Sequence, residues 1–150
     1  MRKTGAPRPP SGQGSEGVLR DAASDGTREY MRLGRSAHGL ERVEARFVGQ
    51  AFAPHRHDSY AIGLTLEGVQ TFRYRGARRI CLPGECHVLH PDELHDGGAG
   101  SAAPFAYRMA YIDPALVQAQ LCGSPLPFVT DPVVRLTDAQ RRLLSAAWDL

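Results

Sequence analysis

Histidines are the residues of this chain whose types and spacing could do chemistry. Five of the six fall between residues 55 and 95, and two form the pair His55-Arg56-His57. In an extended segment these two imidazoles share a face, because side chains alternate along a strand. Imidazole is a good ligand for zinc, iron and nickel, so the pair can supply two ligands of one metal ion. A third must come from another strand, and His87 and His95 are the candidates.

Three interpretations of these histidines stay open. They can line a pocket for a small molecule, or fill surface and structural roles. They can also hold a divalent metal (zinc, iron or nickel), with His55, His57 and His87 as ligands. His90 is expected on the face opposite to His87, because the two are three residues apart in an extended run. His38 and His90 carry no functional expectation.

No other catalytic signature stands out. The chain has no Gly-x-Ser-x-Gly elbow and no phosphate-binding loop. Its three cysteines, Cys81, Cys86 and Cys122, are an odd number without a C-x-x-C pair, so we expect reduced thiols rather than a disulfide framework. The sequence therefore predicts a protein that is not an enzyme and requires no cofactor.

Length and charge narrow the class further. A chain of 150 residues, 42% of them hydrophobic, suits one domain with one core. No run approaches the ~18 apolar residues of a membrane helix, and the first thirty residues lack a secretory signal, so we expect a cytoplasmic protein without a membrane partner. After residue 35 the chain has eleven basic and twelve acidic residues. DNA binding normally needs a basic stripe or a helix-turn-helix, and this sequence has neither.

Three regions follow from the pattern along the chain. Residues 1–35 are rich in Gly, Pro, Ser and charge and are expected to be a disordered leader. Short β-rich runs then recur between turn residues, which predicts an antiparallel barrel over residues 36–113. The predicted strands are 43–48, 60–66, 69–74, 78–82, 87–89 and 107–112. Glu67-Gly68 and Arg75-Gly76 are short enough to close hairpins.

Helical signals follow over residues 114–150. Asp113 and Pro114 predict the start of a short helix that ends before Gly123. The pattern Thr137-x-x-Gln140 is typical of a capping box and predicts a second, amphipathic helix, which is expected to extend to residue 150. We expect this segment to serve as a dimerisation and linker segment, truncated before a DNA-binding domain. Packing against the barrel's own flank is an equally good explanation of its apolar stripes.

Several segments together resemble the ligand-binding and dimerisation domain of AraC-type transcription regulators. They are PHRHDSY at 54–60, EG at 67–68, LPGE at 82–85, HPDELH at 90–95 and FAYRMAYIDP at 105–114. The resemblance implies a mainly β, cupin-like (jelly-roll type) antiparallel barrel followed by two C-terminal helices. It also implies a small-molecule effector, a homodimer formed through those helices, and DNA binding only by a domain absent from this chain.

The resemblance also suggests a site. Within the wider cupin superfamily, His55, His57 and His87 correspond to metal-ligand histidines, whereas Ala61 stands where a glutamate ligand is usual. His95 corresponds to a pocket-lining histidine of AraC-type domains. The expected ligand-binding residues are His55, His57, Tyr60, His87, His95 and Arg108. The alternative is a metal-dependent cupin enzyme, of dioxygenase or isomerase type, built on three histidines.

Overall fold

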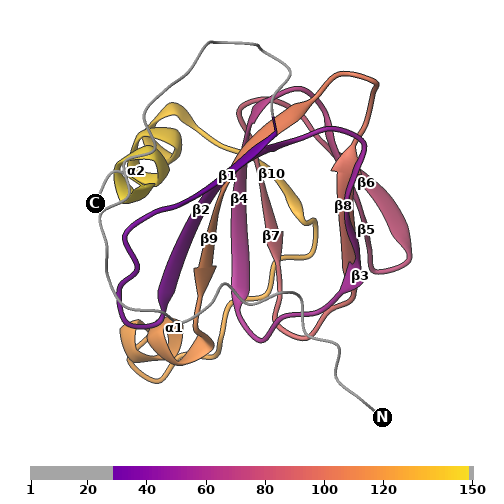
Figure 1. Cartoon of the computed structure of the whole chain (residues 1–150). Helices are drawn as coiled ribbons and strands as arrows, with labels where there is room; N and C mark the ends of the chain where they lie inside the picture. The colour runs from indigo at the N-terminus through magenta and orange to yellow at the C-terminus, as the bar shows by residue number, and fades with distance from the viewer. Residues whose placement is uncertain (1–28, 149–150) are drawn as a thin grey trace.

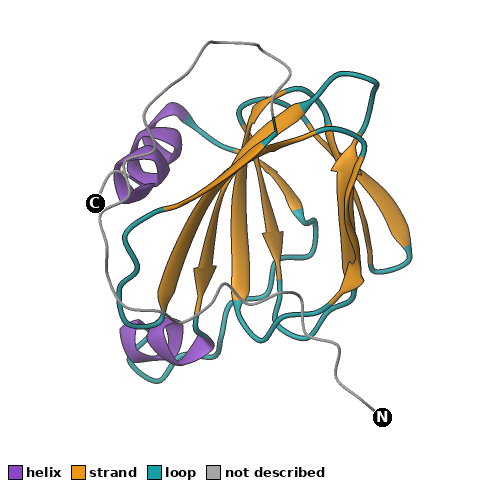
Figure 2. Cartoon of the chain, viewed as in Figure 1, coloured by secondary structure: helices purple, strands orange, loops and turns teal. Residues whose placement is uncertain are grey.

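The computed structural model describes residues 29–148, and these form two antiparallel β-sheets with two helices on one side (Figures 1 and 2). The larger sheet has the order β1-β2-β9-β4-β7-β10 and the smaller one the order β3-β8-β5-β6. The strands are β1 (Tyr30–Leu33), β2 (Leu40–Phe47), β3 (Gln50–His55), β4 (Tyr60–Glu67), β5 (Gln70–Tyr74), β6 (Ala77–Cys81), β7 (Glu85–Leu89), β8 (His95–Ala99), β9 (Phe105–Ile112) and β10 (Val133–Arg135). The helices are α1 (Pro114–Gln120) and α2 (Asp138–Trp148).

The core lies between the two sheets. Alternate residues of the strands point inward, so the interior is filled by a cluster of apolar and aromatic side chains. Its buried members are Ala45, Ala61, Phe72, Tyr74, Cys81, Leu89, Phe105, Tyr107 and Met109. The predicted class, a mainly β antiparallel barrel followed by two helices, is confirmed.

The predicted hairpins are present, and their glycines have a steric reason. Arg75 and Gly76 both have positive φ, 50° and 75°, as a two-residue turn with the twist of its strands requires. Gly68 also has positive φ, 69°, and a Cβ atom there would overlap the Pro104 carbonyl oxygen. These turns fix the order in which the strands pair.

Both helix starts have the caps expected from the sequence. The Asp113 carboxylate accepts from the Ala115 N–H at 2.7 Å. In the capping box, the Thr137 N–H donates to Gln140 Oε1 at 2.9 Å, and the Gln140 N–H donates to Thr137 Oγ1 at 3.3 Å. Figure 1 shows both helices on the side of the larger sheet. At the end of α2, Arg42 of β2 donates to the Ala147 carbonyl at 3.0 Å, which ties the helix to the sheet.

The strand predictions match β2, β4, β5, β6, β7 and β9 but miss four strands. β1 lies inside the range predicted to be a leader, so the expectation of disorder is wrong for residues 30–33, while residues 1–28 lie outside the described part. β3 contains Pro54 and β8 contains Gly97 and Gly98, residue types that weaken a strand pattern. β10 has three residues, too few to show an alternation. Neither helix of residues 29–148 has the length and apolar character to span a bilayer.

Candidate ligand-binding site

Three imidazoles meet at the end of the barrel where α1 lies. His55 ends β3 and pairs with His95 at the start of β8, while His57 lies in the link from β3 to β4. The ring centroids are 4.4 Å apart for His55 and His95, 4.7 Å for His57 and His95, and 6.2 Å for His55 and His57. We call these three residues the histidine triad.

Backbone contacts fix the tautomer of each triad ring. Every Nδ1 atom lies 2.8–2.9 Å from a backbone carbonyl oxygen. A carbonyl only accepts hydrogen bonds, so each Nδ1 carries a hydrogen and each neutral ring has an unprotonated Nε2. The acceptors are Ala53 for His55, Ser59 for His57 and Glu93 for His95. The triad therefore offers three Nε2 atoms that can accept hydrogen bonds.

Burial keeps two of these rings neutral. His95 is 5% exposed, and burial lowers its pKa to about 4, with smaller contributions in the same direction from His57 and His55. Burial also lowers the pKa of His57, while its hydrogen bond to the Ser59 carbonyl opposes that shift. At neutral pH both rings are thus uncharged acceptors rather than cations.

Tyr111 contacts the triad and was not among the site residues expected from the sequence. Its ring centroid lies 5.3 Å from that of His57, in an edge-on arrangement. Burial raises the pKa of Tyr111 to about 12, so the hydroxyl stays protonated and remains a donor at neutral pH. The signal that could have found it is the alternation in β9, where Tyr107, Met109 and Tyr111 share the inward face.

His87 lies within the barrel and interacts electrostatically with His95. It is 1% exposed and packs against Gly63, its cross-strand partner, and Phe72, whose ring centroid is 5.3 Å away. Burial lowers its pKa to about 4, and its Nδ1 is buried without a hydrogen-bond partner. The third imidazole in ring contact with His55 and His57 is therefore His95, while the expectation that His87 completes the set stays a prediction. His87 and His95 both point inward, and the pairing of β3 with β8 decides between them.

Two other expected site residues point away from the interior. Arg108 pairs with Glu44 on β2, Nε to Oε2 at 2.8 Å, on the face opposite to the inward side chain of Met109. The Tyr60 hydroxyl donates to the Pro127 carbonyl at 3.0 Å, outside the barrel wall. Placing Tyr60 and Arg108 among the ligand-binding residues conflicts with the alternation of β4 and β9, which turns both side chains outward.

The triad does not fit a metal centre as arranged. Among residues 29–148, no group of three or more His, Cys, Asp or Glu side chains is placed so that it could hold a metal ion. Ala61, where cupins usually have a glutamate ligand, offers no donor atom.

A hollow of about 500 Å³ lies beside His95. Its rim is formed by the β5–β6 turn and by the loop before β8, and it carries both signs of charge. The charged lining residues are Arg56, Arg73, Arg75, Asp92, Glu93 and Asp96. Positive and negative groups are equally numerous, so the hollow shows no preference for an anion over a cation.

The fold has relatives among solved structures. An RmlC-like cupin with a double-stranded β-helix fold from Methanocaldococcus jannaschii aligns with a TM-score of 0.54 and 8% identity, over 67% of this chain and 94% of that one. A cupin 2 conserved barrel domain protein from Leptotrichia buccalis aligns with a TM-score of 0.53 and 16% identity, over 61% of this chain and 44% of that one. At these identities the likeness shows the cupin fold. A search of curated protein sequences found no match.

The sequence also matches a family model, and the match is long. The model describes the AraC-like ligand-binding domain and covers residues 37–149. It takes in nearly all of the described barrel, both helices and the histidine triad. The chain therefore belongs to the family of AraC-like ligand-binding domains.

Proposed function

We propose that this chain is the ligand-sensing and dimerisation domain of an AraC-family transcription regulator. It binds a small-molecule effector at the histidine triad and needs no metal to do so. It is not an enzyme, it acts in the cytoplasm, and reading DNA is a property of the full-length regulator rather than of these 150 residues. Membership of the AraC-like family supports this role.

The observation that carries the proposal is the triad itself. Three imidazoles lie side by side with their Nδ1 hydrogens committed to backbone carbonyls, so three Nε2 acceptors remain. The Tyr111 ring packs edge-on against that of His57. Such a wall selects a small polar or aromatic molecule that carries hydroxyl or amine donors, because neutral acceptors bind donors and desolvate cheaply compared with charges.

Dimerisation through the C-terminal helices is supported by the surface of α2. Leu143 is 73% exposed, while Leu144 and Ala147 line a shallow groove with Ile62 of β4. Exposed apolar side chains around a groove are typical of a surface that contacts another protein. Leu143→Glu should convert a dimer to a monomer in sedimentation velocity, and Arg142→Glu, on the same exposed helix, should not.

Thermal unfolding against a panel of polyols, amines and aromatic metabolites tests the sensor role. A true effector raises Tm further as its concentration increases, roughly with the logarithm of the concentration above Kd, because it binds only the folded chain. His57→Ala and His95→Ala should abolish the shift, whereas His38→Ala, an exposed histidine outside the triad, should keep it. A shift that survives both triad substitutions would place the binding site elsewhere.

Elemental analysis of untagged protein purified without added metal tests the alternative function, a metal-dependent cupin enzyme. Stoichiometric iron, manganese or nickel that is lost in His57→Ala would overturn the sensor proposal in favour of the enzyme. Metal-free protein that responds to a metabolite supports the sensor.

A further inference from the structure

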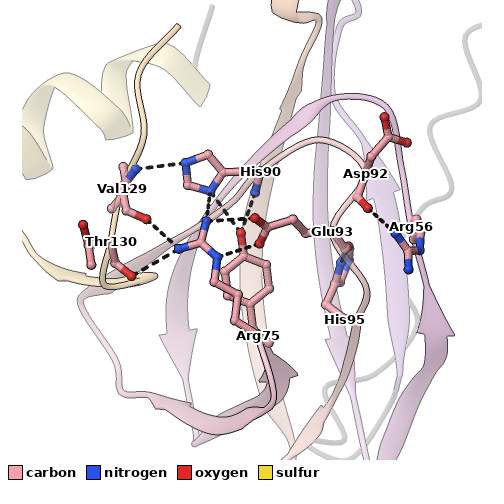
Figure 3. A network of polar contacts seen from close by, with 9 residues as sticks. Arg56, Arg75, His90, Asp92, Glu93, His95, Val129 and Thr130 are labelled. Atoms are coloured by element: carbon pink, nitrogen blue, oxygen red, sulfur yellow. Dashed lines mark hydrogen bonds and ion pairs between the residues drawn. The ribbon is translucent and has the colours of Figure 1, made fainter.

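A network of polar contacts joins the histidine triad to a segment on the outside of the barrel (Figure 3). This segment, residues 126–130, follows α1 and leads into β10, and we call it the strap. Its members include the exposed Phe128 and the backbone groups of Val129 and Thr130. No functional expectation from the sequence concerned the strap or His90, which is the centre of the network.

Arg75 binds the strap through its side chain. Its Nη1 donates to the Val129 carbonyl at 3.0 Å and to the Thr130 carbonyl at 3.2 Å. Its guanidinium also lies over the Phe128 ring, 4.4 Å from the centroid. Arg75 occupies a left-handed backbone position, φ 50°, that residues other than glycine and asparagine rarely adopt. The fold thus holds an arginine at a turn position where its side chain reaches the strap.

The same guanidinium is held from the triad side by Glu93. Arg75 Nε and Nη2 donate to the two carboxylate oxygens at 2.8 and 3.0 Å, a bidentate pair. The backbone carbonyl of Glu93 accepts the Nδ1 hydrogen of His95 at 2.9 Å. One residue, Glu93, therefore contacts a triad ring through its backbone and the strap's anchor through its side chain.

His90 provides a second attachment of the strap. The Val129 N–H donates to His90 Nε2 at 2.9 Å, and the Phe128 ring packs on the imidazole with centroids 4.9 Å apart. The other ring nitrogen, Nδ1, lies 3.0 Å from the Tyr74 hydroxyl and 3.1 Å from Arg75 Nη2, so His90 contacts the same guanidinium that holds the strap. Tyr74 pairs directly with His95 in the sheet, so this path also returns to the triad.

The turn between β7 and β8 is bound to the first half of the site as well. The Asp92 N–H donates to the His57 carbonyl at 2.8 Å, and Arg56 donates to the Asp92 carbonyl at 2.7 Å. Asp92, like Arg75, has a left-handed backbone, φ 60°. A ligand that moves His57 or His95 must therefore also move the turn that carries Glu93.

We propose that Glu93, Arg75 and His90 form a latch through which occupancy of the histidine triad controls whether the strap is docked or released. This deepens the proposed function, on which it rests, by naming how the site is read out. The strap continues into β10, which pairs with β7 at Val133 and His87 and precedes α2. Release of the strap frees the entry to β10 and the connection to α2. A ligand shifts this equilibrium by its difference in affinity for the two states.

Amide hydrogen exchange on the unliganded 150-residue chain tests the latch without any ligand. Arg75→Gln should speed exchange of the Val129 amide at least tenfold, and Glu93→Gln should speed it in the same direction by less. Arg75→Lys should behave like Arg75→Gln, because an ammonium cannot span the carboxylate and two carbonyls as the guanidinium fork does. The matched control is Arg78→Gln, an exposed arginine across the same hairpin, which should leave the amide unchanged. Should Arg75→Gln fail to fold, Glu93→Gln decides alone.

Coupling to the site needs its own readout, because a local anchor would also protect Val129. Equilibrium coupling is reciprocal, so release of the strap must also change the environment of the triad imidazoles. The imidazole ¹⁵N shifts of His95 should change in Arg75→Gln and not in Arg78→Gln. The latch is overturned if exchange at Val129 is unchanged in the latch variants, or if the ¹⁵N shifts of His95 are unchanged in them. Neither result would bear on effector binding. A failed effector screen would instead overturn the sensor role, while the contacts between Arg75, Glu93 and the strap measured on the unliganded chain would stand.

Discussion

The imidazole of His87 lies flat against the backbone of Gly63, its cross-strand partner. A Cβ atom at position 63 would overlap three atoms of this ring. The glycine is therefore required by the histidine that faces it, and the two residues form one packing unit inside the barrel.

Gly63→Ala should lower the free energy of unfolding by about 1–3 kcal/mol, because the added methyl forces the buried ring out of place. Urea unfolding monitored by circular dichroism measures the loss. His87→Ala removes the overlapping ring, so the double variant should be more stable than the sum of the two single losses predicts. Strict additivity of the two losses would contradict the packing argument.

Acid should destabilise the barrel before its carboxylates titrate. Burial lowers the pKa of His87 to about 4, against 6.5 for an ordinary histidine. Above pH 6.5 the His87 ring is neutral in both the folded and the unfolded chain. As the pH falls from 6.5 towards 4, the unfolded chain binds a proton at this ring and the folded chain does not, so the free energy of unfolding decreases. The loss at pH 4 is about 3 kcal/mol for this one buried group. Urea midpoints at pH 7.5 and pH 4.5 measure it, and His87→Leu should show a smaller difference between the two pH values than the parent chain.

Arg108→Ala should leave effector affinity unchanged, since the side chain points away from the triad. The side chains of Arg108 and its partner Glu44 are 30% and 26% exposed, so the expected cost in stability is about 0.2–1 kcal/mol. Isothermal titration with the effector found by thermal shift measures the affinity. A tenfold weaker affinity in Arg108→Ala would return this residue to the site.

The fold could be predicted further from the sequence than the site could. Turn glycines, alternation in β5 and the caps at Asp113 and Thr137 are local signals, and each matches the structure. The choice between His87 and His95 is not local. It depends on the register of β3 against β8, strands about forty residues apart in sequence, and glycines in β8 hide that strand.

Local reasoning could still have placed Arg108 and Tyr111 correctly. In β9 the inward positions are occupied by Phe105, Tyr107 and Met109, so continued alternation puts Tyr111 inside and Arg108 outside. The network around His90 could not have been found this way. It depends on the strap, a segment without regular structure, folding back onto the turn that contains Arg75.

The capping box of α2 offers a direct measure of how firmly that helix is fixed. Thr137→Ala removes the hydroxyl that accepts from the Gln140 N–H and should lower the stability of the chain by about 1 kcal/mol. Urea unfolding measures the change, and Arg142→Ala, in the exposed middle of the same helix, is the matched control. An equal effect of both substitutions would mean that α2 is not held by its cap.

Protonation of His90 should undock the strap. The ring accepts the Val129 N–H at Nε2, so a hydrogen added there sets two donors against each other and breaks the contact. The groups that face His90 are Arg75, Glu93 and the hydroxyls of Tyr60 and Tyr74. Burial and the Arg75 charge lower the pKa of His90, while Glu93 opposes them, so docking is complete above the ordinary pKa of 6.5 and is lost as the pH falls below it.

Nuclear magnetic resonance of the Val129 amide between pH 7.5 and pH 5 checks the expected release, with the Gly84 amide as internal reference. Gly84 donates to the Thr65 carbonyl, an acceptor that does not titrate, so its signal should stay fixed while that of Val129 moves. His90→Asn removes the titrating group and should make the Val129 signal independent of pH. If both amides shift together, global unfolding rather than the strap is responsible, because Gly84 precedes β7 at the end opposite to His90.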